Sequence, residues 1–173
     1  MNFVKVLSRK ESAANASGIP GSPMPQGTSP WNTQAYASRN FFAYESDLPA
    51  GQTLAPAGTV QLTFNIAGDS DFFWTKFAVS GLVAGAAASA ADIPAVSMLL
   101  TNTTTGRQYS SSAVPLANMA GTGQLPFILP QITMWQRKST IVAQLLNLSS
   151  DVTYSNFYLS FMGIKAFPTA ANT

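Results

Sequence analysis

The sequence contains neither cysteine nor histidine, and each absence excludes whole classes of chemistry. Without cysteine there is no disulfide framework, no thiol nucleophile and no iron–sulfur cluster held by thiolates. Without histidine there is no Ser-His-Asp or Cys-His apparatus, no histidine-bearing zinc site and no imidazole pH switch. Because most enzyme classes lose their usual catalytic groups, we expect a protein that is not an enzyme and needs no cofactor.

Charged residues are also scarce. They make up 9% of the 173 residues, against about a quarter in ordinary soluble domains, whereas hydrophobic residues make up 46%. Most of the polar surface must therefore be uncharged, which suits a surface that a partner covers. The net charge of +2 is too small for a dense nucleic-acid-binding field, so nucleic acid is not an expected partner. The exception is the basic start, where Lys5, Arg9 and Lys10 could face nucleic acid or an acidic neighbour.

Long apolar runs are missing as well. The basic start is not followed by the run of about 7–15 apolar residues that a secretory signal requires. The uncharged stretch 77–91 is dominated by Gly, Ala and Ser and is shorter than the about 20 residues of a membrane helix. We therefore expect neither export by that route nor a membrane partner.

The N-terminal third is rich in proline. Residues 12–59 hold six of the eleven prolines among Gly, Ser, Thr, Asn and Gln, a composition that sustains neither a helix nor a central strand. We interpret residues 1–57 as an extended arm. Disordered segments are poor in aromatic residues, so the arm is expected to dock, either on a neighbouring subunit or back over its own domain. Its expected anchors are Trp31, Tyr36, Phe41, Phe42 and Tyr44.

From residue 59 every second residue is hydrophobic, which is the pattern of a half-buried strand. Val60, Leu62, Phe64 and Ile66 alternate with polar residues there. Further strands are expected over 72–79, 96–100, 107–110, 140–148 and 155–167, with loops over 80–91 and 115–130. The apolar pieces Leu125 and 127–129 are expected to be edge or crossover segments. Residues 140–148 also fit an amphipathic helix, but their β-branched start favours a strand.

Short strands separated by turn signals, without a long helix, predict an all-β fold. We expect an antiparallel β-sandwich or jelly roll over residues 58–168, followed by a short tail over 169–173. Apolar residues occur on both faces of the strand at 72–79, as in an inner strand or a strand at an interface. Phe72 and Trp74 are therefore expected to contribute to a protein interface.

Two small groups of residues are candidates for ligand chemistry. Asp69 and Asp71 are the acidic pair close enough to share a calcium ion, but the longer calcium-loop pattern is missing and an Asx turn is the favoured interpretation. Arg137 and Lys138 beside Trp135 could contact a phosphate or a sugar, although a solvated turn before a strand is the commoner role of such a pair. No residue is assigned a catalytic role.

The C-terminal two-thirds of the chain resembles small structural proteins of tailed bacteriophage virions. The resemblance covers about residues 60–167 and lies in the successive segments GDSDFFWTKFAVSG, VSMLLTNTTTGRQYSS, GTGQLPFILPQITMWQRKSTIVAQLLNLSS and NFYLSFMGIKAF. It implies a capsid cement, decoration or minor head protein, or less favourably a head–tail adaptor. Such a protein is made in the host cytoplasm and located in the virion, and its partners are the major capsid protein and further copies of itself.

Aromatic residues, 11% of the chain, keep a second class of function open. Exposed rings stack on sugars, and with Arg137 and Lys138 nearby they would suit a carbohydrate-binding or receptor-binding module of a phage tail. The sequence alone cannot separate an exposed aromatic strip from a core. A core is the default, because a two-sheet sandwich needs large side chains to fill a gap of about 10 Å.

Overall fold

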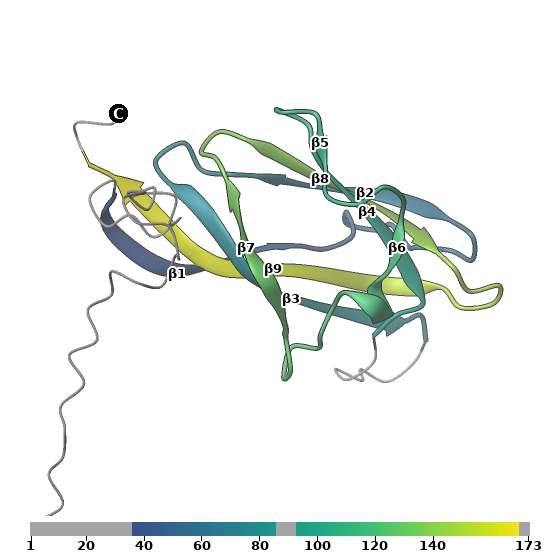
Figure 1. Ribbon diagram of the computed structural model, residues 1–173. Coiled ribbons are helices and arrows are strands. Elements are labelled where there is room, and N and C mark those ends of the chain that lie inside the picture. Colours follow the sequence, from purple (N-terminus) through teal and green to yellow (C-terminus); the bar gives the residue numbers. More distant parts are fainter. Residues whose placement is uncertain (1–35, 86–92, 170–173) are drawn as a thin grey trace, which may run out of the picture. The chain divides into compact units, whose positions relative to one another are not determined.

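Two antiparallel sheets face each other in the computed structural model, which describes residues 36–85 and 93–169 (Figure 1). These residues belong to one unit of the chain, Thr33–Thr173. The first sheet has the order β1 (Tyr36–Ser46), β9 (Tyr154–Pro168), β3 (Asp71–Val83) and β7 (Phe127–Trp135). The second sheet has the order β2 (Thr59–Asn65), β8 (Thr140–Asn147), β4 (Val96–Asn102) and β5 (Arg107–Gln108), and β6 (Val114–Pro115) also pairs with β4.

The strands pair as nested hairpins. β1 pairs with β9, β2 with β8, β3 with β7, and β4 with both β5 and β6. Successive strands from β1 to β4 alternate between the two sheets, and later strands return beside them in reverse order. This is the winding of a jelly roll. The prediction of an all-β antiparallel sandwich is therefore confirmed.

Most strands lie where the hydrophobic period places them. In β2, Leu62 and Phe64 are buried and the intervening Thr63 is exposed. The segment expected over 140–148 forms the strand β8 (Thr140–Asn147) rather than a helix, and the turn before β5 is closed by Gly106, whose φ of +71° suits glycine. β3 is longer than predicted and continues to Val83, into the stretch expected to be a loop.

The predicted loop over residues 115–130 ends earlier than expected, and its apolar piece 127–129, which was expected to be an edge or crossover segment, begins the edge strand β7 (Phe127–Trp135). After the short helix η2 (Leu116–Asn118), the chain enters β7 at Phe127 and passes through Pro130 without leaving the strand. Proline is tolerated there because β7 is an edge strand and its pairing with β3 is interrupted by a register shift between Trp74 and Lys76.

The N-terminal arm is shorter than predicted. Residues 36–46 form β1, which pairs along its length with β9, and the following Leu48 and Leu54 are buried. The domain thus begins well before residue 58. Proline content misled the prediction, because none of the prolines lies within 36–46, where Phe42 and Tyr44 stand two residues apart, as on one face of a strand. Residues 1–35, with Trp31 and the basic start, lie outside the described residues.

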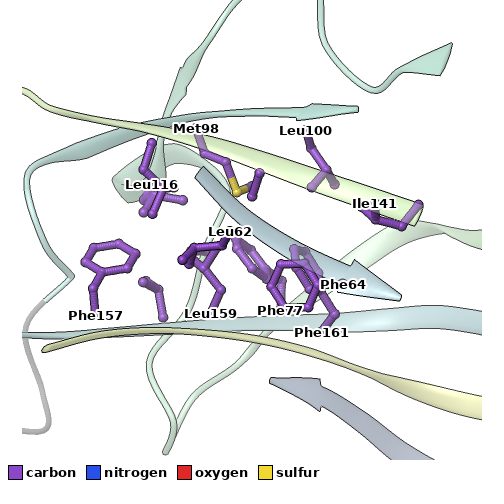
Figure 2. Packing of buried hydrophobic residues seen from close by; sticks show 14 of the residues in the cluster. Leu62, Phe64, Phe77, Met98, Leu100, Leu116, Ile141, Phe157, Leu159 and Phe161 are labelled. Atoms are coloured by element: carbon purple, nitrogen blue, oxygen red, sulfur yellow. The ribbon is translucent and has the colours of Figure 1, made fainter. Parts of the chain in front are cut away.

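Aromatic rings fill the space between the sheets (Figure 2). Phe157, Leu159 and Phe161 of β9 lie on one side of this space, with Met98 and Leu100 of β4 on the other. Phe161 is fully buried. Its ring centroid lies 4.8 to 5.1 Å from those of four aromatic neighbours, Phe64, Phe77, Trp135 and Trp74. Such edge-to-face and offset contacts stabilise a core beyond the burial of apolar area.

One buried polar side chain ties the loops at one end of the sandwich together. The Asn147 amide nitrogen donates to the carbonyl oxygens of Leu54, Ala55 and Val152 at 3.1, 3.0 and 2.7 Å. Its amide oxygen accepts the Ser149 N–H at 2.9 Å. Because one side chain of β8 bonds to both segments, this amide fixes the segment that follows β1 against the end of β8.

Candidate functional site

The outer face of the first sheet carries a row of apolar side chains that crosses all of its strands. Phe41 of β1 lies opposite Ile164 of β9, Ile164 lies opposite Phe73 of β3, and Phe73 lies opposite Met134 of β7. Residues directly opposite each other in antiparallel strands share a face. These four residues are here called the apolar row.

The apolar row lies on the side of the sheet away from the core. Phe72 belongs to the core, and the next residue, Phe73, must point to the opposite face. Phe41 is 72% exposed and Met134 is 43% exposed, so the two ends of the row are open to solvent. Phe73 in the middle is buried, and the Tyr36 ring packs edge-on against it at a centroid distance of 5.6 Å.

A second row lies beside the first. Ala43 is opposite Met162, Met162 is opposite Lys76, and Lys76 is opposite Ile128, which is 69% exposed. Together the two rows leave Phe41 exposed on β1 and Met134 and Ile128 exposed on β7, whereas on β3 between them Phe73 is buried and Lys76 is exposed. Contiguous apolar surface on a soluble protein marks a place where a partner binds.

β1 supplies one end of both rows and is the edge of the sheet, with β9 as its one partner among the described residues. Two charged residues, Arg39 and Glu45, flank Phe41 and Ala43 on the outer face. The Ser160 hydroxyl donates to the Glu45 carboxylate at 3.2 Å across the β1–β9 pair. The edge strand therefore offers an apolar centre between opposite charges.

The inner side of β1 is attached to the core. The Tyr44 ring packs edge-on against Phe72 at 4.9 Å, and its hydroxyl accepts the Ala67 N–H at 2.9 Å. Phe42 packs on Tyr44 at 4.8 Å, and the Lys165 ammonium lies 3.9 Å from the centre of the Phe42 ring. Among the expected arm anchors that the structure describes, Phe41 alone is left largely exposed, and the others contact their own domain.

The two weaker groups of candidate residues meet at one end of the first sheet. Asp69, Asp71, Arg137 and Lys138 line an open cleft of about 840 Å³. The Asp71 carboxylate accepts the Tyr36 hydroxyl at 3.1 Å and the Arg137 backbone N–H at 2.9 Å. Asp71 thus joins β1 to the turn after β7, a structural role rather than a ligand role.

The contact between Tyr36 and Asp71 has an electrostatic consequence. Partial burial raises the pKa of the Tyr36 hydroxyl above its ordinary value, and the negative charge and hydrogen bond of Asp71 raise it further. The phenol therefore stays neutral at physiological pH and remains a donor to Asp71.

Metal binding gains no support at Asp69 and Asp71. The Asp69 carboxylate accepts the hydroxyl of the adjacent Ser70 at 2.8 Å, as in a local turn. Among the described residues, no group of three acidic, histidine or cysteine side chains is placed to hold a metal ion.

Three predicted contact residues are in fact core residues. Phe72 and Trp135 are fully buried and Trp74 is nearly so, and all three belong to the hydrophobic core between the sheets. The predicted interface role of Phe72 and Trp74 is corrected, because the inward face of β3 carries them and Phe73 has the outward position. Trp135 likewise offers no ring to a ligand beside Arg137 and Lys138.

The sequence analysis did not single out Ile164, Met134 or Phe73. A signal for Ile164 was present, since alternation in β9 separates the buried Phe161 from Met162 and Ile164 on the other face. The apolar row could be recognised only from the register between strands, because its four residues are distant from one another in the sequence.

Compared with known proteins, the chain matches no protein-family model, no curated protein and no solved structure at a significant level. Within residues 36–85 and 93–169, no helix has the length and apolar character needed to cross a bilayer.

Proposed function

We propose that this protein is a non-enzymatic structural subunit of a bacteriophage virion, a capsid cement, decoration or minor head protein. It binds neighbouring subunits through the outer face of its first sheet. The observation that carries the proposal is the apolar row, which spans the sheet from Phe41 to Met134 with exposed ends. Covering such a surface by a partner is favourable because it removes apolar area from water.

The fold and the composition support the same function. Jelly rolls serve as coat domains of viruses, although lectins and cupins share the architecture, so the fold alone does not decide the function. A chain with 9% charged residues also keeps few charges that must be desolvated when neighbours pack against it. A repeated lattice then strengthens each weak contact by multivalency.

The alternative function, a carbohydrate-binding module, is less well supported by the structure. It required an exposed aromatic ring beside Arg137 and Lys138, and Trp135 is buried. The structural role is therefore the function that the surface supports best.

The proposal is tested by following the protein in lysates of the cells that produce it. We expect it to sediment with particles that contain nucleic acid, at a fixed copy number relative to their major coat protein. A variant with Phe41→Ser and Met134→Ser should fold normally but be lost from the particles, whereas Gln61→Ser with Gln144→Ser on the second sheet should be retained. Recovery of the natural protein as free molecules alone would contradict the proposal.

A further inference from the structure

We propose that two copies of this protein pair through the edge of β1 that faces away from β9, antiparallel, with Phe42 opposite the partner's Phe42. The partner is thus a second copy of this chain, and the pairing joins two first sheets into one continuous sheet. The inference rests on the proposed function, because it names the contact by which one subunit of an assembly would recognise the next.

The first argument is the character of the edge. β1 has 11 residues, whereas strands have a mode of about 5–6. Natural edge strands are protected by shortness, proline, bulges or charges that point inward. β1 contains no proline, and its one register shift lies at its beginning, between Tyr36 and Ser38. Residues 38–46 therefore form a long, regular edge of the kind that accepts another strand.

The second argument is the register. A two-fold axis through a residue of β1 places opposite residues on the same face and with matching hydrogen-bonding character, as an antiparallel pair requires. With the axis at Phe42, Arg39 lies opposite the partner's Glu45, and Glu45 lies opposite the partner's Arg39. Both charged residues of the strand then find the opposite charge directly across the edge.

Neighbouring registers lose this complementarity. With the axis at Phe41, Arg39 lies opposite the partner's Ala43. With the axis at Ala43, the exposed Phe41 lies opposite the partner's Glu45. Charge complementarity thus selects the axis at Phe42 among the central registers.

The third argument is the packing of the outer face. With the axis at Phe42, Phe41 lies opposite the partner's Ala43, a large side chain beside a small one. The apolar row of each copy then continues into the partner's second row. Pairing would cover Phe41, which is the most exposed residue of the apolar row at 72%.

The chain's lack of cysteine allows the register to be read directly. In the full-length protein, Phe42→Cys should give an intermolecular disulfide under mild oxidation. Opposite Cα atoms of antiparallel strands are about 4.5–5.5 Å apart. A disulfide spans about 4.4–6.8 Å. Phe41→Cys alone and Ala43→Cys alone should give little dimer, but a mixture of these two variants should cross-link.

The matched control is Gln144→Cys, which places a thiol at an exposed position on the outer face of the second sheet. Its cross-linking measures random collision. Equal dimer yields from Phe42→Cys and Gln144→Cys would overturn the pairing. A yield that peaks for Phe41→Cys or Ala43→Cys alone would overturn the register.

Charge reversal tests the complementarity independently of cysteine geometry. In the Phe42→Cys background, Arg39→Glu or Glu45→Arg should lower the rate of dimer formation about tenfold, because each places like charges opposite one another at two positions. The two reversals together should restore the rate. No change in either single variant would contradict the role of these charges.

Failure of this inference is distinguishable from failure of the proposed function. If the protein sediments with particles but none of the single-cysteine variants cross-links above the control, the pairing is wrong and the structural role stands. If Phe42→Cys cross-links selectively but the protein is absent from particles, the pairing stands and the structural role is wrong.

Discussion

The two sheets have similar inner faces and very different outer faces. On the outer face of the second sheet, Gln61 lies opposite Gln144 and Gln144 lies opposite Leu99, while Thr63 lies in the next row. On the outer face of the first sheet, the corresponding positions hold the apolar row from Phe41 to Met134. Both sheets need an apolar inner face for the shared core, so folding does not explain the difference.

The proposed function accounts for this difference if the second sheet faces water and the first sheet faces the proposed partner. Uncharged polar side chains satisfy a solvated sheet face, as on the second sheet. Large apolar side chains on a solvated face gain nothing for folding and add a risk of aggregation. The second sheet carries the exposed Leu146, which lies opposite Thr59 and Ser97, whereas the first sheet carries Phe41, Met134 and Ile128, which the proposed contact would cover.

Removing β1 should disrupt the first sheet and, with it, the folded sandwich. A chain that begins at Thr33 keeps every described strand and should unfold cooperatively, like the full chain. A chain that begins at Ala55 loses β1, together with Leu48, Leu54 and the Tyr44 ring that packs on Phe72. We expect it to lack a cooperative thermal transition, as measured by near-ultraviolet circular dichroism. An unchanged transition in the shorter chain would show that β1 is dispensable for the sandwich.

Two phenylalanines of the first sheet should behave in opposite ways. Phe161→Ala removes a ring that contacts both sheets, and we expect the free energy of unfolding to fall by about 3–5 kcal/mol. Phe41→Ala, on the outer face, should change it by less than about 0.5 kcal/mol. Urea denaturation measures both values. A large loss for Phe41→Ala would mean that the outer face stabilises the fold rather than binding a partner.

A similar pair of variants exists on β8 of the second sheet. Asn147→Ala removes the amide that donates to the carbonyl oxygens of Leu54, Ala55 and Val152 and should lower the free energy of unfolding by about 1–3 kcal/mol. The Leu54 and Ala55 carbonyls keep the backbone N–H donors of Tyr154 and Gly58, so the loss falls mainly on Val152. Gln144→Ala, three residues earlier on the exposed face, should cost less than about 0.5 kcal/mol. Chemical denaturation of the two variants checks this, and equal values would refute the role given to the Asn147 amide.

The smallest expected effect is the pH dependence due to Tyr36. Because the pKa of Tyr36 is raised on folding, its contribution to stability is intact below the ordinary value of 10.0. That contribution is lost as the pH rises through the higher value of the folded protein. Above about pH 10, the melting temperature of Tyr36→Phe should therefore fall less steeply than that of the natural protein. Parallel curves for the two proteins would contradict the coupling to Asp71.

The fold class was accessible from the sequence because alternation in segments such as β2 and β9 depends on burial against a single core. β1 was misassigned because prolines on both sides of it obscured its own alternation. Phe72 and Trp74 were placed at an interface because composition shows that both faces of β3 are apolar but not which face is inward. The apolar row was inaccessible for a different reason. Its members are brought together by strand register, which a single sequence does not display.

Hydroxyl-radical footprinting of the protein in its native particles and as purified protein, diluted until it does not self-associate, tests the central claim most directly. We expect Phe41 and Met134, at the ends of the apolar row, to be protected in the particles. Leu146 on the second sheet, which is also exposed in the single chain, should react equally in both states. Equal labelling of Phe41 and Met134 in both states, or protection of Leu146 instead, would contradict the account.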